Sequence, residues 1–207
     1  MTPYYEENGV VIYNADCREI LPILEPVDLV LTDPPFGLGN FVQVTGNVRG
    51  EKVTWNDAAP DSDFFNLLRS KSKHRIIWGA NYFNCFDSDG GAIVWVKNQP
   101  MPDFSKADIA SCSLHKRVEI YTRTWTNFVN TKQTKHPCER PVALYAWCLS
   151  KYAAASDLIL DPFMGSGSVL VAAKNCNLKA IGIEIEERYC EIAANRLRQE
   201  VLNFEVA

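Results

Sequence analysis

Two short motifs in this 207-residue chain combine residue types that could do chemistry, and each follows a short apolar run. They read Asp33-Pro34-Pro35-Phe36 and Asp161-Pro162-Phe163-Met164-Gly165-Ser166-Gly167. In the first motif the two prolines fix φ and remove backbone N–H donors, so oxygen acceptors dominate its polar surface. A carboxylate, a carbonyl and an aromatic ring at one strand end suit the binding of a planar ring with an amino group. A strand-ending turn without chemistry is the alternative.

The second motif has the form of a ligand-binding turn between a strand and a helix. Gly165 and Gly167 can adopt positive φ and leave room for a ligand close to the backbone. Leu170 stands where a dinucleotide site needs its third glycine, which disfavours a nicotinamide-linked dehydrogenase. Glu184, at the end of the next expected strand, can accept hydrogen bonds from two ribose hydroxyls. Taken alone, the two glycines could also form a purely structural turn.

The elements that would position these motifs alternate between short apolar runs and helical stretches, which is typical of an α/β protein with a mainly parallel sheet. The expected strands are 10–15, 28–31, 74–78, 92–96, 117–121, 157–160 and 180–183. The expected helices are 18–24, 62–72, 141–153, 166–175 and 186–202. Near-continuous apolar strands indicate a sheet covered on both faces.

The composition predicts a single domain over residues 1–207, because 47% hydrophobic residues in a chain of this length can fill one core. Residues 37–60 and 97–106 lack a clear element, and loops of this kind are usually functional. We therefore expect target-contacting insertions at 37–60 and 97–135. No apolar run reaches the ~18–20 residues of a membrane span, and the N-terminus does not resemble a signal peptide, so a cytoplasmic protein is expected.

Cysteine usage and charge narrow the class further. Seven scattered cysteines without a CxxC pair predict reduced thiols rather than a disulfide framework or a metal site. The net charge of −4 argues against general polyanion binding, but residues 115–140 hold six basic and two acidic side chains. A basic strip on an acidic body is typical of a protein that contacts nucleic acid on one face. An ordinary solvated surface is the alternative.

The two motifs together resemble those of S-adenosylmethionine-dependent methyltransferases that act on exocyclic amino groups of DNA bases. The base-binding motif precedes the cofactor motif, an order that resembles the circularly permuted beta class. Residues 76–83 and 93–97 resemble a small phage-type subgroup. The resemblance covers nearly the whole chain. It implies a Rossmann-like class I methyltransferase fold with a seven-stranded, mostly parallel sheet, helices on both faces and a circularly permuted order.

The resemblance also implies a set of S-adenosylmethionine contacts. They are Asp16, Cys17, Asp33, His136, Arg140, Asp161, Pro162, Phe163, Gly165, Ser166, Gly167, Glu184 and Ile185. Arg140 stands where the family's His-Pro-x-x-Lys-Pro element has lysine, and it would close over the methionine carboxylate. Asp16 would meet the adenine amino group, cap the helix that follows, or do both. Residues 135–141 could instead be only the start of a helix.

For the reaction, the resemblance implies that Asp33 and the Pro34 carbonyl accept the amino hydrogens of an extruded base, while Phe36 stacks on that base. Aspartate rather than serine at position 33 favours adenine N6 over cytosine N4 as the target. The partner would be double-stranded DNA, a homodimer is a further expectation, and restriction–modification is the expected setting. The expected DNA contacts are Arg49, Lys52, Asn81, Lys97, Lys116, Arg117, Arg123 and Lys132.

Several other functions stay open at this point. Cytosine N4 methylation would change only the base. A methyltransferase for RNA or protein glutamine is less consistent with Asp33, because such enzymes usually carry asparagine there and place this motif after the cofactor loop. A methyltransferase-like DNA-binding protein without turnover is the last alternative, and intact Asp33, Phe36, Gly165 and Glu184 argue against it.

Overall fold

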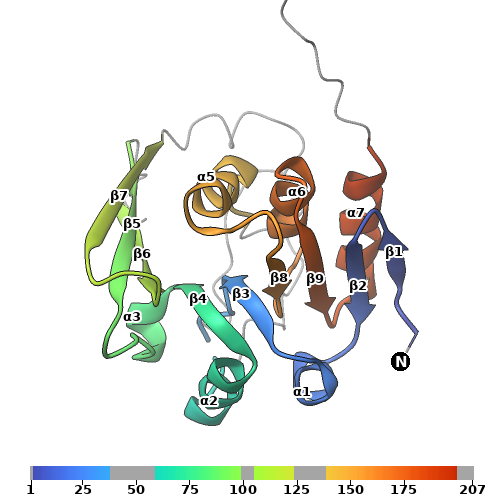
Figure 1. Cartoon of the computed structure of the whole chain (residues 1–207), viewed down its shortest axis with the longest axis horizontal. Coiled ribbons are helices and arrows are strands. Elements are labelled where there is room, and N and C mark those ends of the chain that lie inside the picture. The colour runs from blue at the N-terminus through green and yellow to red at the C-terminus, as the bar shows by residue number, and fades with distance from the viewer. Residues whose placement is uncertain (1, 38–58, 99–104, 124–138, 200–207) are drawn as a thin grey trace, which may run out of the picture.

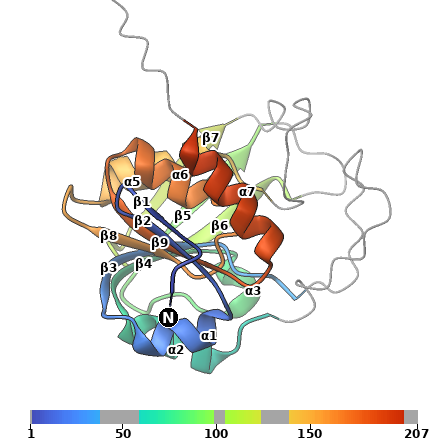
Figure 2. The same ribbon diagram turned by 90° about the vertical axis from the view of Figure 1, so that its right-hand side faces the viewer.

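The computed structural model describes residues 2–37, 59–98, 105–123 and 139–199, which form one sheet with helices on both faces (Figures 1 and 2). The strands are β1 (Tyr5–Glu7), β2 (Val10–Asn14), β3 (Val27–Thr32), β4 (Ser72–Trp78), β5 (Gly91–Lys97), β6 (Ala107–Cys112), β7 (Val118–Arg123), β8 (Leu158–Asp161) and β9 (Lys179–Glu184). The helices are α1 (Cys17–Ile20), the 3-10 helix η1 (Leu21–Ile23), α2 (Ser62–Ser70), α3 (Ala80–Phe83), α5 (Val142–Tyr152), α6 (Ser168–Asn175) and α7 (Glu187–Arg198). None of the helices in these ranges has the length and apolar character needed to cross a membrane.

The strand order across the sheet is β1-β2-β9-β8-β3-β4-β6-β5-β7. From β2 to β4 all neighbours are parallel, so the carboxyl ends of these five strands share one edge, which we call the carboxyl edge. β6 runs antiparallel to both of its neighbours, while β5 and β7 again run in the direction of β4. Both sequence motifs lie at the carboxyl edge, one after β3 and the other beginning at the end of β8.

The seven expected strands are confirmed, with ends that differ by at most two residues. The expected total of seven is wrong, because the described residues contain nine strands. β1 escaped notice because two of its three residues are exposed glutamates. β6 was not expected within the insertion 97–135, because Asp108 and Ser111 interrupt its apolar pattern.

The five expected helical stretches are also confirmed, with changes at their ends, although residues 200–202 of the last stretch lie outside the described residues. The stretch 18–24 divides into α1 and η1, and Pro22 stands in the first turn of η1. α6 starts at Ser168 because Gly167 adopts a left-handed φ of 79°. α3 was not predicted, since four residues are too few to show a helical period.

The two faces of the sheet have separate cores. Helices α5, α6 and α7 cover one face and α1 and α2 cover the other (Figure 2). In β3, Leu29 and Leu31 point into the first core and Val30 into the second. β3 and β8 are neighbours in the sheet. The chain leaves β3 toward α2 on one face and leaves β8 toward α6 on the other face. Such a switch point is where open α/β sheets bind ligands.

Candidate active site

Asp33 directly follows β3, and its carboxylate is held by Arg140, two residues before α5. Arg140 Nε donates to Asp33 Oδ2 at 2.5 Å, and Nη2 donates to Oδ1 at 2.8 Å. The remaining nitrogen, Nη1, donates to Asp108 on β6. The side chain of Arg140 is 7% exposed and that of Asp33 is 18% exposed. We expected Arg140 to meet the cofactor carboxylate, and the structure instead brings it to Asp33 in a two-point pairing that fixes the plane of the carboxylate.

Two tryptophans and a lysine complete the surroundings of Arg140. The guanidinium carbon lies 5.2 Å from the ring centroid of Trp78 and 5.9 Å from that of Trp95. Lys97 Nζ bonds Asp108 Oδ1 at 2.8 Å, and its side chain is only 10% exposed. Lys97 was expected to contact DNA, but its ammonium group is engaged inside the protein. Asp108 was missed as a functional candidate because its strand was missed.

The pKa values in this cluster reflect burial in competition with charge. Burial is the largest influence on Asp33 and raises the pKa of its carboxyl, whereas Arg140 acts in the opposite direction. Burial would also raise the pKa of Asp108, but Arg140 and Lys97 outweigh it and hold that pKa below its usual value. Burial raises the pKa of Tyr145 on α5, so its phenol is neutral at physiological pH. Asp33 and Asp108 thus share the positive charge of Arg140, and Asp108 has that of Lys97 in addition.

Phe36 lies in an aromatic setting built by the end of β4 and by α3. Its ring stacks on Tyr82 with centroids 4.6 Å apart and an interplanar angle of 20°. Phe83 contacts it at 5.8 Å in a tilted arrangement. A Cβ on Gly79 would lie 2.3 Å from the Phe36 ring, so the ring packs directly on this glycine. The segment 76–83, singled out in the sequence, thus supplies neighbours of Phe36 rather than an independent site.

A buried hydrogen bond joins the two motifs. Thr32 Oγ1, at the end of β3, donates to Asp161 Oδ1 at 2.7 Å, and the Phe163 N–H donates to the same oxygen at 3.2 Å. Asp161 is 3% exposed, and burial raises its pKa to about 7. The acid therefore holds the turn after β8 against the end of β3.

Glu184, at the end of β9, reaches the Gly-rich turn. Its Oε2 accepts from the Gly165 N–H at 3.0 Å, and its Oε1 accepts from the Glu186 N–H at 2.9 Å. Asn14, at the end of β2, donates to the backbone carbonyls of Glu184 and Ile185 at 3.0 Å each. The carboxylate is thereby oriented toward the turn.

The remaining expected cofactor residues lie nearby at the ends of β2 and β9. Asp16 Oδ1 accepts from the Arg18 N–H at 2.8 Å, so Asp16 does cap the following helix. Cys17 is buried, which raises the pKa of its thiol to about 12. Ile185 is 59% exposed, beside the half-buried carboxylate of Glu184. His136 lies outside the described residues.

Comparison with known proteins identifies the family. A family model described as DNA methylase matches residues 97–195. The type II methyltransferase M.HpaI of Haemophilus parainfluenzae is 35% identical over 225 residues, covering 86% of this chain and 70% of that protein. The chain belongs to the DNA methylase family. The type II methyltransferase M2.LlaDCHI of Lactococcus lactis subsp. cremoris is 25% identical over 248 residues, covering 95% of this chain and 92% of that protein.

Solved structures share the fold of this DNA methylase. M1.HpyAVI, crystallised as a complex with SAM, aligns with a TM-score of 0.65 at 24% identity over 90% of this chain and 99% of that chain. The PvuII DNA methyltransferase, described as cytosine-N4-specific, aligns with a TM-score of 0.67 at 16% identity over 96% and 89% of the two chains. The expected Rossmann-like class I methyltransferase fold is therefore confirmed.

In this DNA methylase the residue before Arg140 joins the other half of the site. Glu139 Oε1 lies 2.9 Å from Arg196 Nη1 on α7. Arg196 Nη1 also donates to the backbone carbonyl and to Oγ of Ser166, at 2.8 and 2.9 Å. Glu139 thus faces the Gly-rich turn while Arg140 faces Asp33. Sequence reasoning missed Arg196, which nothing distinguishes from other helix-surface arginines.

Some expected DNA contacts of the DNA methylase lie at the carboxyl ends of the strands, and others lie at the opposite ends. Arg123 pairs in register with Lys97 and so lies at the carboxyl edge. Lys116 and Arg117 precede the other end of β7, about 20 Å away along the strand, and both are exposed. Asn81 is exposed on α3, next to the ring that stacks on Phe36. Three further expected contacts lie outside the described residues: Arg49, Lys52 and Lys132.

Proposed function

We propose that this DNA methylase transfers the methyl group of S-adenosylmethionine to N6 of an adenine that has been extruded from double-stranded DNA. The observation that carries the proposal is the geometry of Asp33. Its carboxylate is oriented by Arg140, lies at the carboxyl edge beside Phe36, and is joined to the Gly-rich turn through the Thr32–Asp161 bond.

The residues of the Gly-rich turn fit the cofactor. Each oxygen of Glu184 accepts one backbone N–H and keeps a second lone pair, so both ribose hydroxyls can donate to it. Gly165 and Gly167 have φ of 51° and 79°, a conformation that side chains disfavour and that brings the backbone close to a ligand. Ile185 offers an exposed apolar surface beside them. When bound, the cofactor supplies an electrophilic methyl group on a sulfonium centre.

Asp33 can activate an amino group without a covalent intermediate. Each of its oxygens accepts one hydrogen bond from Arg140 and has a second lone pair available for an amino hydrogen. Such a bond draws the amino nitrogen toward sp³ geometry and frees its lone pair for attack. Held in place by Arg140, the carboxylate needs little reorganisation during the reaction.

The target base needs an aromatic partner outside the duplex, and Phe36 supplies it. The base would replace the Tyr82 ring on Phe36, which costs about 1 kcal/mol of ring stacking, and would regain a similar amount from its own stacking. We further propose that Arg123 and Asn81 contact the DNA, together with residues 38–58 and 124–135 of the two expected insertions, since β6 and β7 of the stretch 97–135 belong to the sheet. A short recognition sequence, a homodimer and a restriction–modification setting complete this proposal.

The test is methyl transfer from isotopically labelled S-adenosylmethionine to unmethylated genomic DNA, followed by digestion and separation of the nucleosides. Label in N6-methyl-2′-deoxyadenosine is expected for the wild-type protein and is expected to be absent for Asp33→Ala. Urea unfolding of the variant controls for folding, since Asp33 is itself an expected cofactor contact.

Other outcomes of this experiment would redirect the proposal. Label in N4-methylcytosine would keep the reaction and change the base. Cofactor binding without transfer to DNA would favour RNA or protein as the substrate, or a DNA-binding protein without turnover. Absence of cofactor binding by the folded wild-type protein would overturn the methyltransferase reaction itself.

A further inference from the structure

Four charged side chains from four segments meet beside the reacting centre. They are Asp33 after β3, Lys97 at the end of β5, Asp108 on β6 and Arg140 before α5, and we call them the charge quartet. Their side chains are between 7% and 19% exposed. Two negative and two positive charges balance when all four are ionised, so the quartet is neutral as a whole.

We propose that Asp108 is a positioning residue for Asp33 and that it acts through Arg140. The inference rests on the proposed function, in which Asp33 accepts the amino hydrogens of the base. Arg140 presents a planar fork of donors, of which two go to Asp33 and one to Asp108. Because the guanidinium is held from both ends, its plane is fixed, and so is the plane of the Asp33 carboxylate.

The tryptophans restrict Arg140 in the remaining direction. Its guanidinium carbon lies 5.2 Å from the Trp78 ring centroid and 5.9 Å from that of Trp95. Both indole nitrogens are buried without a hydrogen-bond partner among the described residues. The two rings therefore contact Arg140 through their aromatic faces and not through hydrogen bonds. The rings and Asp108 together leave the guanidinium one orientation.

Lys97 explains why a second buried acid is tolerated in this position. Two carboxylates sharing a single guanidinium would leave an uncompensated negative charge, which is costly away from water. Lys97 Nζ lies 2.8 Å from Asp108 Oδ1 and supplies the missing positive charge. Asp108 therefore remains ionised and keeps its hold on Arg140.

The charges of the quartet predict the sign of each variant's effect on Asp33. The titratable groups that face Asp33 are Arg140, Asp108 and Lys97, together with Tyr145 on α5 and Asp161 on β8. Loss of the negative charge of Asp108 favours ionised Asp33 and moves its titration to lower pH. Loss of the positive charge of Lys97 does the reverse. These opposite shifts report the electrostatic coupling of the two charges to Asp33, whereas the plateau rate reports how well the carboxylate is positioned.

The experiment compares wild-type protein with the variants Asp108→Asn, Lys97→Gln and Arg140→Lys. The Asp33 carboxyl is titrated by NMR in protein with ¹³C-labelled aspartate, and Asp33→Asn assigns the signal. The pH dependence of single-turnover methyl transfer is measured in parallel. For Asp108→Asn we expect the Asp33 titration and the acid limb of the rate profile at lower pH, and a plateau rate reduced about tenfold with cofactor affinity unchanged.

For the other two variants the expected shifts differ. Lys97→Gln is expected to move the titration and the acid limb to higher pH. Arg140→Lys keeps the positive charge but loses the fork, so its plateau rate is expected to fall at least as far as that of Asp108→Asn.

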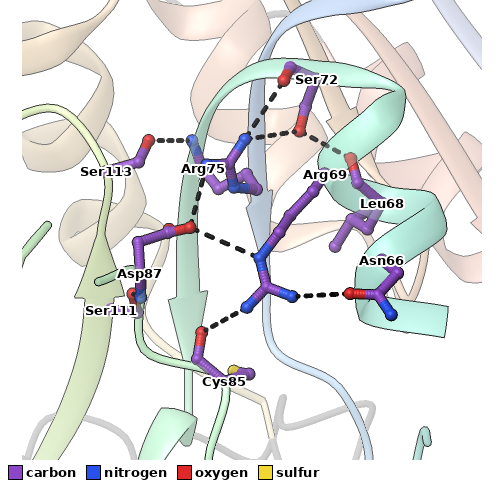
Figure 3. Close-up of polar contacts among 9 residues, drawn as sticks. All are labelled: Asn66, Leu68, Arg69, Ser72, Arg75, Cys85, Asp87, Ser111 and Ser113. Carbon is purple, nitrogen blue, oxygen red and sulfur yellow. Dashed lines mark hydrogen bonds and ion pairs between the residues drawn. The ribbon is translucent and has the colours of Figure 1, made fainter. Parts of the chain in front are cut away.

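A second acid with two basic partners provides the matched control. Asp87, after α3, bonds Arg75 Nη2 at 3.0 Å and lies 3.5 Å from Arg69 Nε, and its side chain is 13% exposed (Figure 3). These contacts join α2 and β4 to the loop after α3, and none of them reaches the charge quartet. Asp87→Asn is expected to lower stability as Asp108→Asn does, but to leave the Asp33 titration and the acid limb unchanged.

Two results would overturn the inference. One is an Asp108→Asn protein with the wild-type Asp33 titration and plateau rate, since Asp108 would then have a structural role alone. The other is a shift of equal size in Asp87→Asn, since the effect would then follow from general destabilisation. If the wild-type protein transferred no methyl group to DNA, the proposed function would fail, whereas the NMR titrations would still decide whether Asp108 is coupled to Asp33.

Discussion

Asp161 illustrates at the scale of one residue how a buried acid is used to hold two motifs together. It accepts hydrogen bonds from Thr32 Oγ1 and from the Phe163 N–H, which come from the two strand ends that carry the motifs. The same burial that makes these bonds strong disfavours the charged carboxylate and raises its pKa to about 7. Near neutral pH, ionisation of this buried carboxyl therefore lowers the stability of the folded protein.

We predict that Asp161→Asn changes the pH dependence of stability in a defined direction. Asp161 has a folded pKa above its unfolded value of 3.8, so the folded state holds the proton more tightly. Its contribution is therefore fully present below that unfolded value and is lost as the pH rises through about 7. Asparagine keeps an acceptor for Thr32 and Phe163 but does not titrate.

Urea unfolding at about pH 5 and about pH 8 measures this effect. Relative to wild type, Asp161→Asn is expected to be more stable at about pH 8 than at about pH 5, so its free energy of unfolding minus that of wild type is larger at the higher pH. Groups that titrate equally in both proteins cancel in this difference. An identical difference at both pH values would contradict the prediction.

At the scale of elements, the segment that leads into α5 connects the two halves of the site. Glu139 bonds Arg196 on α7, which also holds Ser166 of the Gly-rich turn, and the next residue, Arg140, bonds Asp33. Adjacent residues on one segment therefore face the Gly-rich turn and Asp33. The position of α5 is fixed by these contacts as well as by its apolar face.

We predict that Arg196→Met destabilises the protein by about 3 kcal/mol, because it leaves the carboxylate of Glu139 buried without this partner. The Gly-rich turn loses the bonds to Ser166 at the same time, so weaker cofactor binding is also expected. Urea unfolding and calorimetric titration with S-adenosylmethionine measure the two effects. Arg198→Met, two residues later and exposed, is the control and is expected to change stability by less than about 0.5 kcal/mol.

At the scale of the whole molecule, the direction of the strands separates basic side chains that are close in sequence. Arg123 lies at the carboxyl edge with Asp33, whereas Lys116 lies beyond the opposite end of β7. Lys116 also pairs with Asp89 at 3.3 Å on an exposed surface. If the target base binds at Asp33 as proposed, the DNA can use Arg123 more readily than Lys116.

We predict that Arg123→Gln reduces the slope of log affinity for DNA against log salt concentration by about 1, as expected for loss of one phosphate contact. Lys116→Gln removes the same charge at the far end of the strand and is expected to leave this slope unchanged. Fluorescence anisotropy with labelled duplex DNA over a range of salt concentrations measures both. Equal effects of the two variants would mean that DNA is bound without regard to the carboxyl edge.

Features that depend on neighbouring residues can be predicted from the sequence, whereas features that depend on contacts between distant segments cannot. Apolar runs such as Leu158–Leu160 are local, and they predicted seven strands and the turn after β8. β6 has a mixed pattern, so its strand and Asp108 were both missed. The pairing of Arg140 with Asp33 depends on packing between segments more than 100 residues apart, and local sequence patterns do not record such a contact.

The distance along the chain between Asp33 and Arg140 also bears on protein synthesis. The two residues are separated by 107 positions, and their pairing needs β3, β6 and the start of α5 to be in place. A ribosome that adds about 10 residues per second takes on the order of 10 s to cover this interval. A nascent or prematurely terminated chain would carry the complete Asp33-Pro34-Pro35-Phe36 motif without the arginine that orients it.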